Sequence, residues 1–136
     1  MTFVVGYDES PGANNALDAA IELAARFGEP IVLVYGVSPP GGLGEEFRAH
    51  QSALVEMGRL ATSHALAKAA AAGVEATVEL VHEKPARALV DVANARDARM
   101  IIVGSHGEGA LRGVLLGSTA YRLVHQSTRP VLVVPG

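Results

Sequence analysis

Residues 100–107 read Met-Ile-Ile-Val-Gly-Ser-His-Gly, and the pair Gly117-Ser118 follows after nine further residues. The apolar run at 100–103 predicts a buried strand, because β-branched residues favour a pleated surface that is covered on both sides. The glycines after it let the backbone approach an anion closely, and a helix beginning near Ser118 would add unpaired N–H groups and a partial positive charge. This stretch therefore predicts a phosphate-binding loop between a strand and a helix.

The rest of the chain alternates between strand and helix patterns. Strands are expected at residues 3–6, 31–37, 75–81, 99–103 and 130–134, and helices at 11–27, 43–72, from 85 onward and at 118–126. Ser10 is expected to cap the first helix, Pro11 to occupy its first position, and Gly28 and Gly73 to end the first and second helices. Charged residues alternate with apolar ones at 75–81, which predicts an edge strand. In the second helix, Ala61, Ala65 and Met57 are expected on the packed side together with Phe47 and Leu54.

This order of elements predicts one α/β domain over residues 1–136. Five strands separated by four helices indicate a doubly wound open parallel sheet with helices on both faces. A chain of 136 residues with 49% apolar residues can bury a core of that kind. Ligands of such sheets bind where neighbouring strands have connections leading to opposite faces, at the carboxyl ends of the strands.

Composition narrows the function classes. The absence of cysteine excludes disulfides and thiol chemistry. No apolar run approaches the ~18 residues of a membrane span, and the first residues lack a basic leader, so we expect a cytoplasmic protein without a membrane partner. The net charge is −3, yet residues 84–136 hold seven bases against three acids. That half suits a small anion, but it has no basic run interleaved with aromatic residues, which argues against a nucleic-acid partner.

The sequence lacks the common catalytic and cofactor-binding motifs. Gly107-Glu108-Gly109 lacks the third glycine of the dinucleotide fingerprint, and no lysine follows Lys84 to complete a P-loop. The five histidines show no metal-binding spacing, and no nucleophile elbow occurs. We therefore assign no catalytic residue and no protein metal site.

The spacing G-x2-G-x9-G-S resembles the ATP-binding type of the universal stress protein family, over nearly the whole chain. That resemblance implies the strand order 3-2-1-4-5 and the binding of the adenine nucleotide ATP together with Mg²⁺. It also implies a homodimer paired through strand 131–134. An apolar edge strand without charges favours such pairing, unless the chain's own terminus or a helix covers it.

The resemblance also implies roles for particular residues. Gly104, Gly107, Gly117, Ser118 and Thr119 would surround the ribose and phosphates. Asp8 would hold ribose hydroxyls or help to position a cation, and the backbone of Val37 would read adenine. Plainer roles stay open: helix capping for Ser118, a turn or cap for Asp8, and core packing for Val37.

Arg112 lies inside the glycine loop, where it either neutralises a phosphate or is simply solvated. His106 lies in the same loop and is not expected to be catalytic. Family members often carry Gly-x-Pro before the third helix, whereas this chain has Glu83-Lys84-Pro85. A charge at that position would narrow the adenine end of the site or change its selectivity.

The sequence thus predicts an ATP-binding regulator of the universal stress protein type. Two other functions stay open. A slow ATP hydrolase or nucleotidyl-transferase on the same scaffold would show sustained turnover that depends on Asp8. A dimeric interaction module would associate without any affinity for nucleotide.

Overall fold

A computed structural model of the chain describes residues 1–36, 45–106 and 116–136. For residues 45–51 and for Leu54, only the backbone is described. The strands are β1 (Thr2–Gly6), β2 (Ile31–Gly36), β3 (Ala76–Val81), β4 (Ala98–Gly104) and β5 (Val131–Val134). The helices are α1 (Pro11–Phe27), α2 (Glu45–Ala71), α3 (Pro85–Ala95) and α4 (Ser118–Gln126). Every described boundary lies within two residues of the position expected from sequence.

The five strands form one parallel sheet in the order β3-β2-β1-β4-β5. The predicted doubly wound α/β fold and its strand order are therefore confirmed. β3 is an edge strand, as its alternating charges indicated, and β5 forms the opposite edge. The change in winding direction lies between β1 and β4, which places the expected ligand crevice at the carboxyl ends of those two strands.

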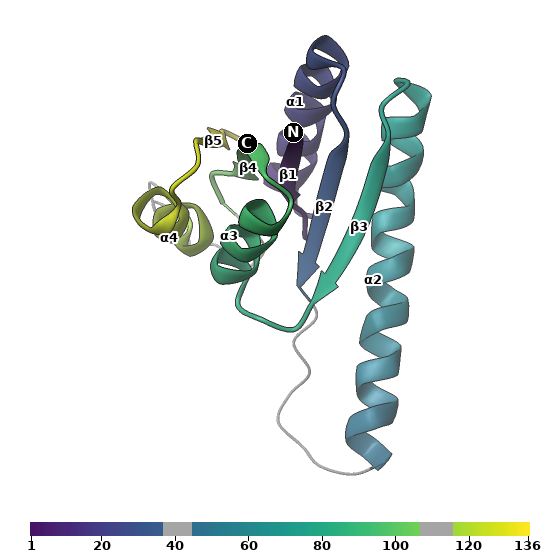
Figure 1. Cartoon of the computed structure of the whole chain (residues 1–136). Helices are drawn as coiled ribbons and strands as arrows, with labels where there is room; N and C mark the ends of the chain where they lie inside the picture. Colours follow the sequence, from purple (N-terminus) through teal and green to yellow (C-terminus); the bar gives the residue numbers. More distant parts are fainter. Residues whose placement is uncertain (37–44, 107–115) are drawn as a thin grey trace.

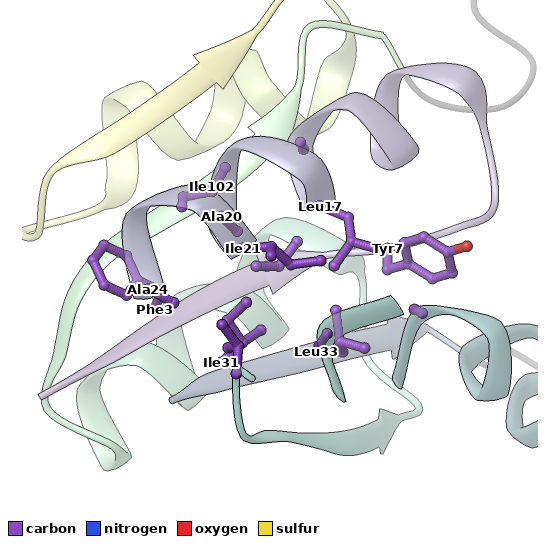
Figure 2. Close-up of a cluster of buried hydrophobic side chains, with 14 of the residues drawn as sticks. Phe3, Tyr7, Leu17, Ala20, Ile21, Ala24, Ile31, Leu33 and Ile102 are labelled. Carbon is purple, nitrogen blue, oxygen red and sulfur yellow. The ribbon is translucent and has the colours of Figure 1, made fainter. Parts of the chain in front are cut away.

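Alternating side chains of the central strands supply two separate cores. Phe3 and Val5 of β1 lie on one face beneath α1 and α2, whereas Val4 lies on the other face beneath α3 and α4. Figure 2 shows the first core, in which Leu17 and Ile21 of α1 lie against the sheet residues. Both faces of the central strands are buried, which explains why their sequences are apolar without alternation.

Local signals set the ends of α1 as the sequence predicts. The Ser10 hydroxyl accepts a hydrogen bond from the Ala13 N–H at 3.1 Å, and Pro11 follows as the first helical residue. At the other end Gly28 adopts φ 68°, a left-handed conformation that glycine reaches without steric cost. Gly73 has φ 75° and follows α2 in the same way.

The long helix α2 packs along only part of its length. Its 27 residues rise about 40 Å, whereas the six residues of β3 rise about 20 Å. Figure 1 shows α2 extending well past the sheet at the carboxyl ends of the strands. Ala61 and Ala65 are buried as expected, but Met57 is 62% exposed, so its expected place on the packed side was wrong. Phe47 and Leu54 belong to the residues whose side chains are not described. Within the described part of the chain, no helix is long and apolar enough to cross a membrane.

Candidate functional site

The segment after β1 makes one wall of the carboxyl-edge crevice. The Asp8 carboxylate accepts a hydrogen bond from the Ser10 N–H at 3.0 Å, so it helps to form the turn that leads into α1. Asp8 is half-exposed and lies two residues beyond the end of β1. Burial, followed by the charges of Glu9 and Asp8, raises the pKa of Tyr7, and the Tyr7 hydroxyl donates to Asn14 Oδ1 at 3.2 Å.

Two glycines bring α1 and the end of β4 into direct backbone contact. A Cβ on Gly104 would lie 2.6 Å from the carbonyl carbon and oxygen of Gly12, and a Cβ on Gly12 would lie 2.5 Å from the His106 oxygen. Real Cβ atoms essentially never come so close to other heavy atoms. Gly104 is therefore required for packing between helix and strand, a role that the sequence interpretation had not separated from anion binding.

Backbone hydrogen bonds join the two ends of the glycine loop. The Ser105 N–H donates to the Val134 oxygen at 2.9 Å, which extends the pairing between β4 and β5. The Gly117 N–H donates to the Ser105 oxygen at 2.6 Å, and so brings the start of α4 back to the end of β4. The Ser105 hydroxyl lies 3.1 Å from His106 Nδ1. Gly104, Gly117 and Ser118 are thus gathered at one edge of the sheet.

The first turn of α4 presents free donor groups. Gly117 occupies the cap position with φ −65° and ψ 161°, no side chain caps the helix, and no acidic residue lies in its first turn. The first intrahelical bond runs from the Tyr121 N–H to the Gly117 oxygen. The N–H groups of Ser118 and Thr119 precede it, and such groups, together with the helix dipole, favour an anion.

A pocket of about 250 Å³ lies between the beginnings of α3 and α4. Its lining residues are Lys84, Pro85, Ala86, Ser118, Thr119 and Arg122. Two of the predicted site residues, Ser118 and Thr119, thus line the same pocket as Lys84 and Pro85, which follow Glu83, the residue in which this chain departs from the family pattern. Arg122 was missed by sequence reasoning, although its spacing of four residues from Ser118 puts both on one face of a helix and was a usable signal.

Three of the predicted site residues cannot be placed. Val37, Gly107 and Arg112 lie outside the described residues, as does the loop expected at residues 38–42. Asp8, Gly104, Gly117, Ser118 and Thr119 are all described, and all lie at the carboxyl edge of the sheet. Among the residues that the structure describes, no three His, Cys, Asp or Glu side chains are grouped so that they could hold a metal ion.

The fold and this edge define a doubly wound α/β protein with an anion-favouring crevice. The model of the universal stress protein family matches residues 1–135, so the chain belongs to that family. The chain is 32% identical to universal stress protein MJ0531 of Methanocaldococcus jannaschii, over 96% of the chain and 79% of that protein. It is 31% identical to a universal stress protein of Mycolicibacterium smegmatis over 98% of the chain, but it spans only 47% of that protein.

Solved structures agree with this membership. The hypothetical protein MJ0577 superposes with a TM-score of 0.88 over 99% of this chain and 95% of that one; at 22% identity it supports the fold alone. A universal stress protein from Archaeoglobus fulgidus in complex with dAMP is 25% identical with a TM-score of 0.72, covering 98% and 96% of the two chains. A universal stress protein in complex with cAMP is also 25% identical, with a TM-score of 0.73 and the same coverage. Adenine nucleotides therefore bind to some proteins that resemble this one.

Proposed function

We propose that this protein binds ATP at the carboxyl edge of its sheet and acts as a nucleotide-responsive regulator in the cytoplasm. The observation that carries the proposal is the convergence of three features at one edge: the uncapped first turn of α4, the glycine-bearing end of β4, and the half-exposed carboxylate of Asp8. The first turn of α4 favours phosphate, and the glycine at the end of β4 lets a ligand approach the backbone closely. The Asp8 carboxylate can accept hydrogen bonds from ribose hydroxyls. The nucleotide complexes of related proteins support the same ligand class.

Mg²⁺ would enter this site with the nucleotide. Among the residues that the structure describes, Asp8 supplies a carboxylate at this edge, and one of its oxygens accepts the Ser10 N–H. Mg²⁺ commonly binds through one or two carboxylates together with phosphate oxygens and water, so this donor set suits a metal–nucleotide complex better than a metal held by protein alone. The ion would screen charge on the phosphates. No described residue is assigned as a base for hydrolysis.

Substitution of Gly117 tests the proposal sharply. Its φ and ψ lie in an extended region that any residue adopts, and aspartate is among the preferred residues at a helix cap. Gly117→Asp should therefore keep the fold and cap α4, while its carboxylate competes with phosphate for the free N–H groups. Gly117→Asn is the matched control, because it caps the helix equally well without the negative charge.

Thermal unfolding with and without MgATP gives the readout. A ligand present at about 100 times its Kd stabilises the folded state by roughly 2.7 kcal/mol. Wild type should show that shift, Gly117→Asn should keep much of it, and Gly117→Asp should lose it while melting no lower than wild type without ligand. If no adenine nucleotide shifts the wild type, ATP binding is refuted and the dimeric interaction module becomes the better function. ATP turnover that is lost in Asp8→Ala would instead favour a hydrolase.

We also propose that the protein is a homodimer paired through β5. Pro130 and Val134 direct their carbonyl groups toward β4, at 2.9 Å from the Ile101 and Ser105 N–H groups. Because backbone groups alternate along a strand, Val131 and Val133 present theirs to the outer edge. Gly136 lies against Asn15 and Gly12 of α1. An open apolar edge of this kind favours pairing with a second copy.

Proline at an outward-facing position tests this dimer. Val133→Pro removes the outward N–H and leaves the bonds to β4 in place, which an edge strand tolerates. Light scattering should give about twice the 14.0 kDa chain mass for wild type and the single chain mass for the variant, with unchanged circular dichroism. A wild-type monomer, or a variant that stays dimeric, would rule out pairing through β5.

A further inference from the structure

The pocket between α3 and α4 holds two cationic side chains on opposite walls. Lys84 precedes α3, and Arg122 lies one turn into α4. Ser118 and Thr119 line the same pocket, so it is continuous with the proposed nucleotide site. Its volume of about 250 Å³ lies below the roughly 300–1,000 Å³ of pockets that enclose a whole small-molecule ligand. The pocket therefore suits one end of a nucleotide rather than all of it.

The ion pairs of the protein set these two cations apart. Nine lysine and arginine side chains are described, and six of them pair with a carboxylate. Among the described residues, Lys84, Arg122 and Arg59 are the cations without such a pair, and two of these three line one pocket. The neighbouring Glu83 is exposed and does not line it. In the part of the chain that the structure describes, positive charge is thus gathered at this pocket and no carboxylate lines it.

The beginnings of α3 and α4 add to the positive electrostatic potential of this pocket. Each begins at the pocket, neither has a side chain that caps it, and neither has an acidic residue in its first turn. The partial positive charges of both helix beginnings therefore reinforce Lys84 and Arg122. Such a field favours a multiply charged anion over a singly charged one, because each added negative charge interacts with all four positive groups.

We propose that this pocket binds the terminal phosphates of a nucleotide, and that Lys84 and Arg122 make the protein select nucleoside di- and triphosphates over monophosphates. This inference rests on the proposed nucleotide function and names the residues that determine its phosphate selectivity. It places Lys84 at the phosphate end of the site, in place of the adenine end expected for this segment from the family resemblance. Charge-assisted hydrogen bonds from Lys and Arg to phosphate are stronger than hydrogen bonds between neutral groups, and Arg can bind phosphate through two donors at once. A ligand with a single phosphate, held at Ser118 and Thr119, would fill only that part of the pocket and leave Lys84 and Arg122 without a phosphate to bind.

The test compares nucleotides that differ only in phosphate number. Isothermal titration with AMP, ADP and ATP, without Mg²⁺ and at fixed ionic strength, gives the ratio of the AMP and ATP dissociation constants. The variants are Lys84→Gln, Arg122→Gln and the double substitution. Arg59→Gln is the matched control, because it removes an unpaired cation from α2 and changes the net charge equally. Tripolyphosphate is titrated as a probe that has no adenine or ribose.

Wild type and Arg59→Gln should bind ATP at least about tenfold more tightly than AMP, as expected for contacts with charged groups. The double substitution should bring that ratio close to one while leaving AMP affinity within about twofold, which also shows that the fold is intact. Tripolyphosphate should bind wild type and not the double variant. Equal ratios in wild type and double variant would overturn the selectivity while ATP binding stands. If no nucleotide binds but tripolyphosphate still binds through Lys84 and Arg122, the proposed nucleotide function is refuted, whereas the pocket stands as a polyphosphate site. If none of the four ligands binds, both the nucleotide function and the phosphate pocket are refuted.

Discussion

Replacing Gly104 by alanine tests how closely α1 and β4 are fitted together. The added Cβ would lie 2.6 Å from the carbonyl carbon and oxygen of Gly12 and 2.9 Å from its Cα. Ordinary contacts begin at 3.4 Å, so the two backbones would have to separate by about 0.8 Å. All three opposing atoms are backbone atoms, so no flexible side chain can move aside and the beginning of α1 itself must shift.

The expected cost follows from this geometry. Overpacking a well-packed interior costs about 1–3 kcal/mol, and we expect the upper half of that range because both sides of the contact are backbone. For a chain of 136 residues, each kcal/mol lowers the Tm by roughly 3–5 °C, so Gly104→Ala should melt about 6–15 °C below wild type.

Gly36→Ala is the matched control for this experiment. Among the residues that the structure describes, a Cβ at Gly36 would meet only the Pro85 ring, at 4.0 Å, and Gly36 has no positive φ. Alanine there should be neutral or should stabilise by up to about 1 kcal/mol through the unfolded state. Differential scanning calorimetry of both variants gives the comparison. Equal melting temperatures for Gly104→Ala and Gly36→Ala would refute the close backbone approach that the crevice depends on.

Three further predictions concern stability. Ser10→Ala removes the cap of α1 and should cost about 1 kcal/mol in urea unfolding; an unchanged midpoint would mean that the cap contributes nothing. Leu123→Ala empties a fully buried position and should cost about 2–5 kcal/mol, whereas Val124→Ala, at a side chain 47% exposed, should change stability by less than about 0.5 kcal/mol. The hydrogen bond and charge of Arg99 lower the pKa of Glu29 below its ordinary value of 4.5. The stability that the pair contributes is therefore complete above about pH 4.5 and is lost as the pH falls through the lowered pKa. Glu29→Gln lacks this contribution, so its stability should fall less steeply than that of wild type as the pH is lowered. Identical acid unfolding curves for the two proteins would contradict this.

Most of the fold could be predicted because its signals are local. Ser10, Pro11 and Gly28 each act on their own turn of α1, and the apolar runs of β1, β2 and β4 each indicate burial without reference to partners. The strand order could not be obtained in this way, since periodicity contains no information on which strands are neighbours. It came from the family resemblance, and the sheet confirms it.

The parts that sequence reasoning missed depend on contacts between distant segments. The packing role of Gly104 follows from the position of Gly12, which is 92 residues earlier in the chain. The pocket shared by Lys84 and Arg122 exists only because α3 and α4 lie side by side on one face. Met57 was misplaced because its helical spacing predicts a common face but not how far the sheet extends beneath that face.

The most direct measurement of the central claim is a titration of ¹⁵N-labelled protein with MgATP, followed by amide chemical shifts. We expect the largest shifts at Asp8, at residues 104–106 and at Ser118 and Thr119, with little change in the C-terminal half of α2. Shifts of that pattern would place the nucleotide at the carboxyl edge of β1 and β4. An unchanged spectrum at millimolar MgATP, or shifts confined to surfaces away from these residues, would contradict the claim that this edge is a nucleotide site.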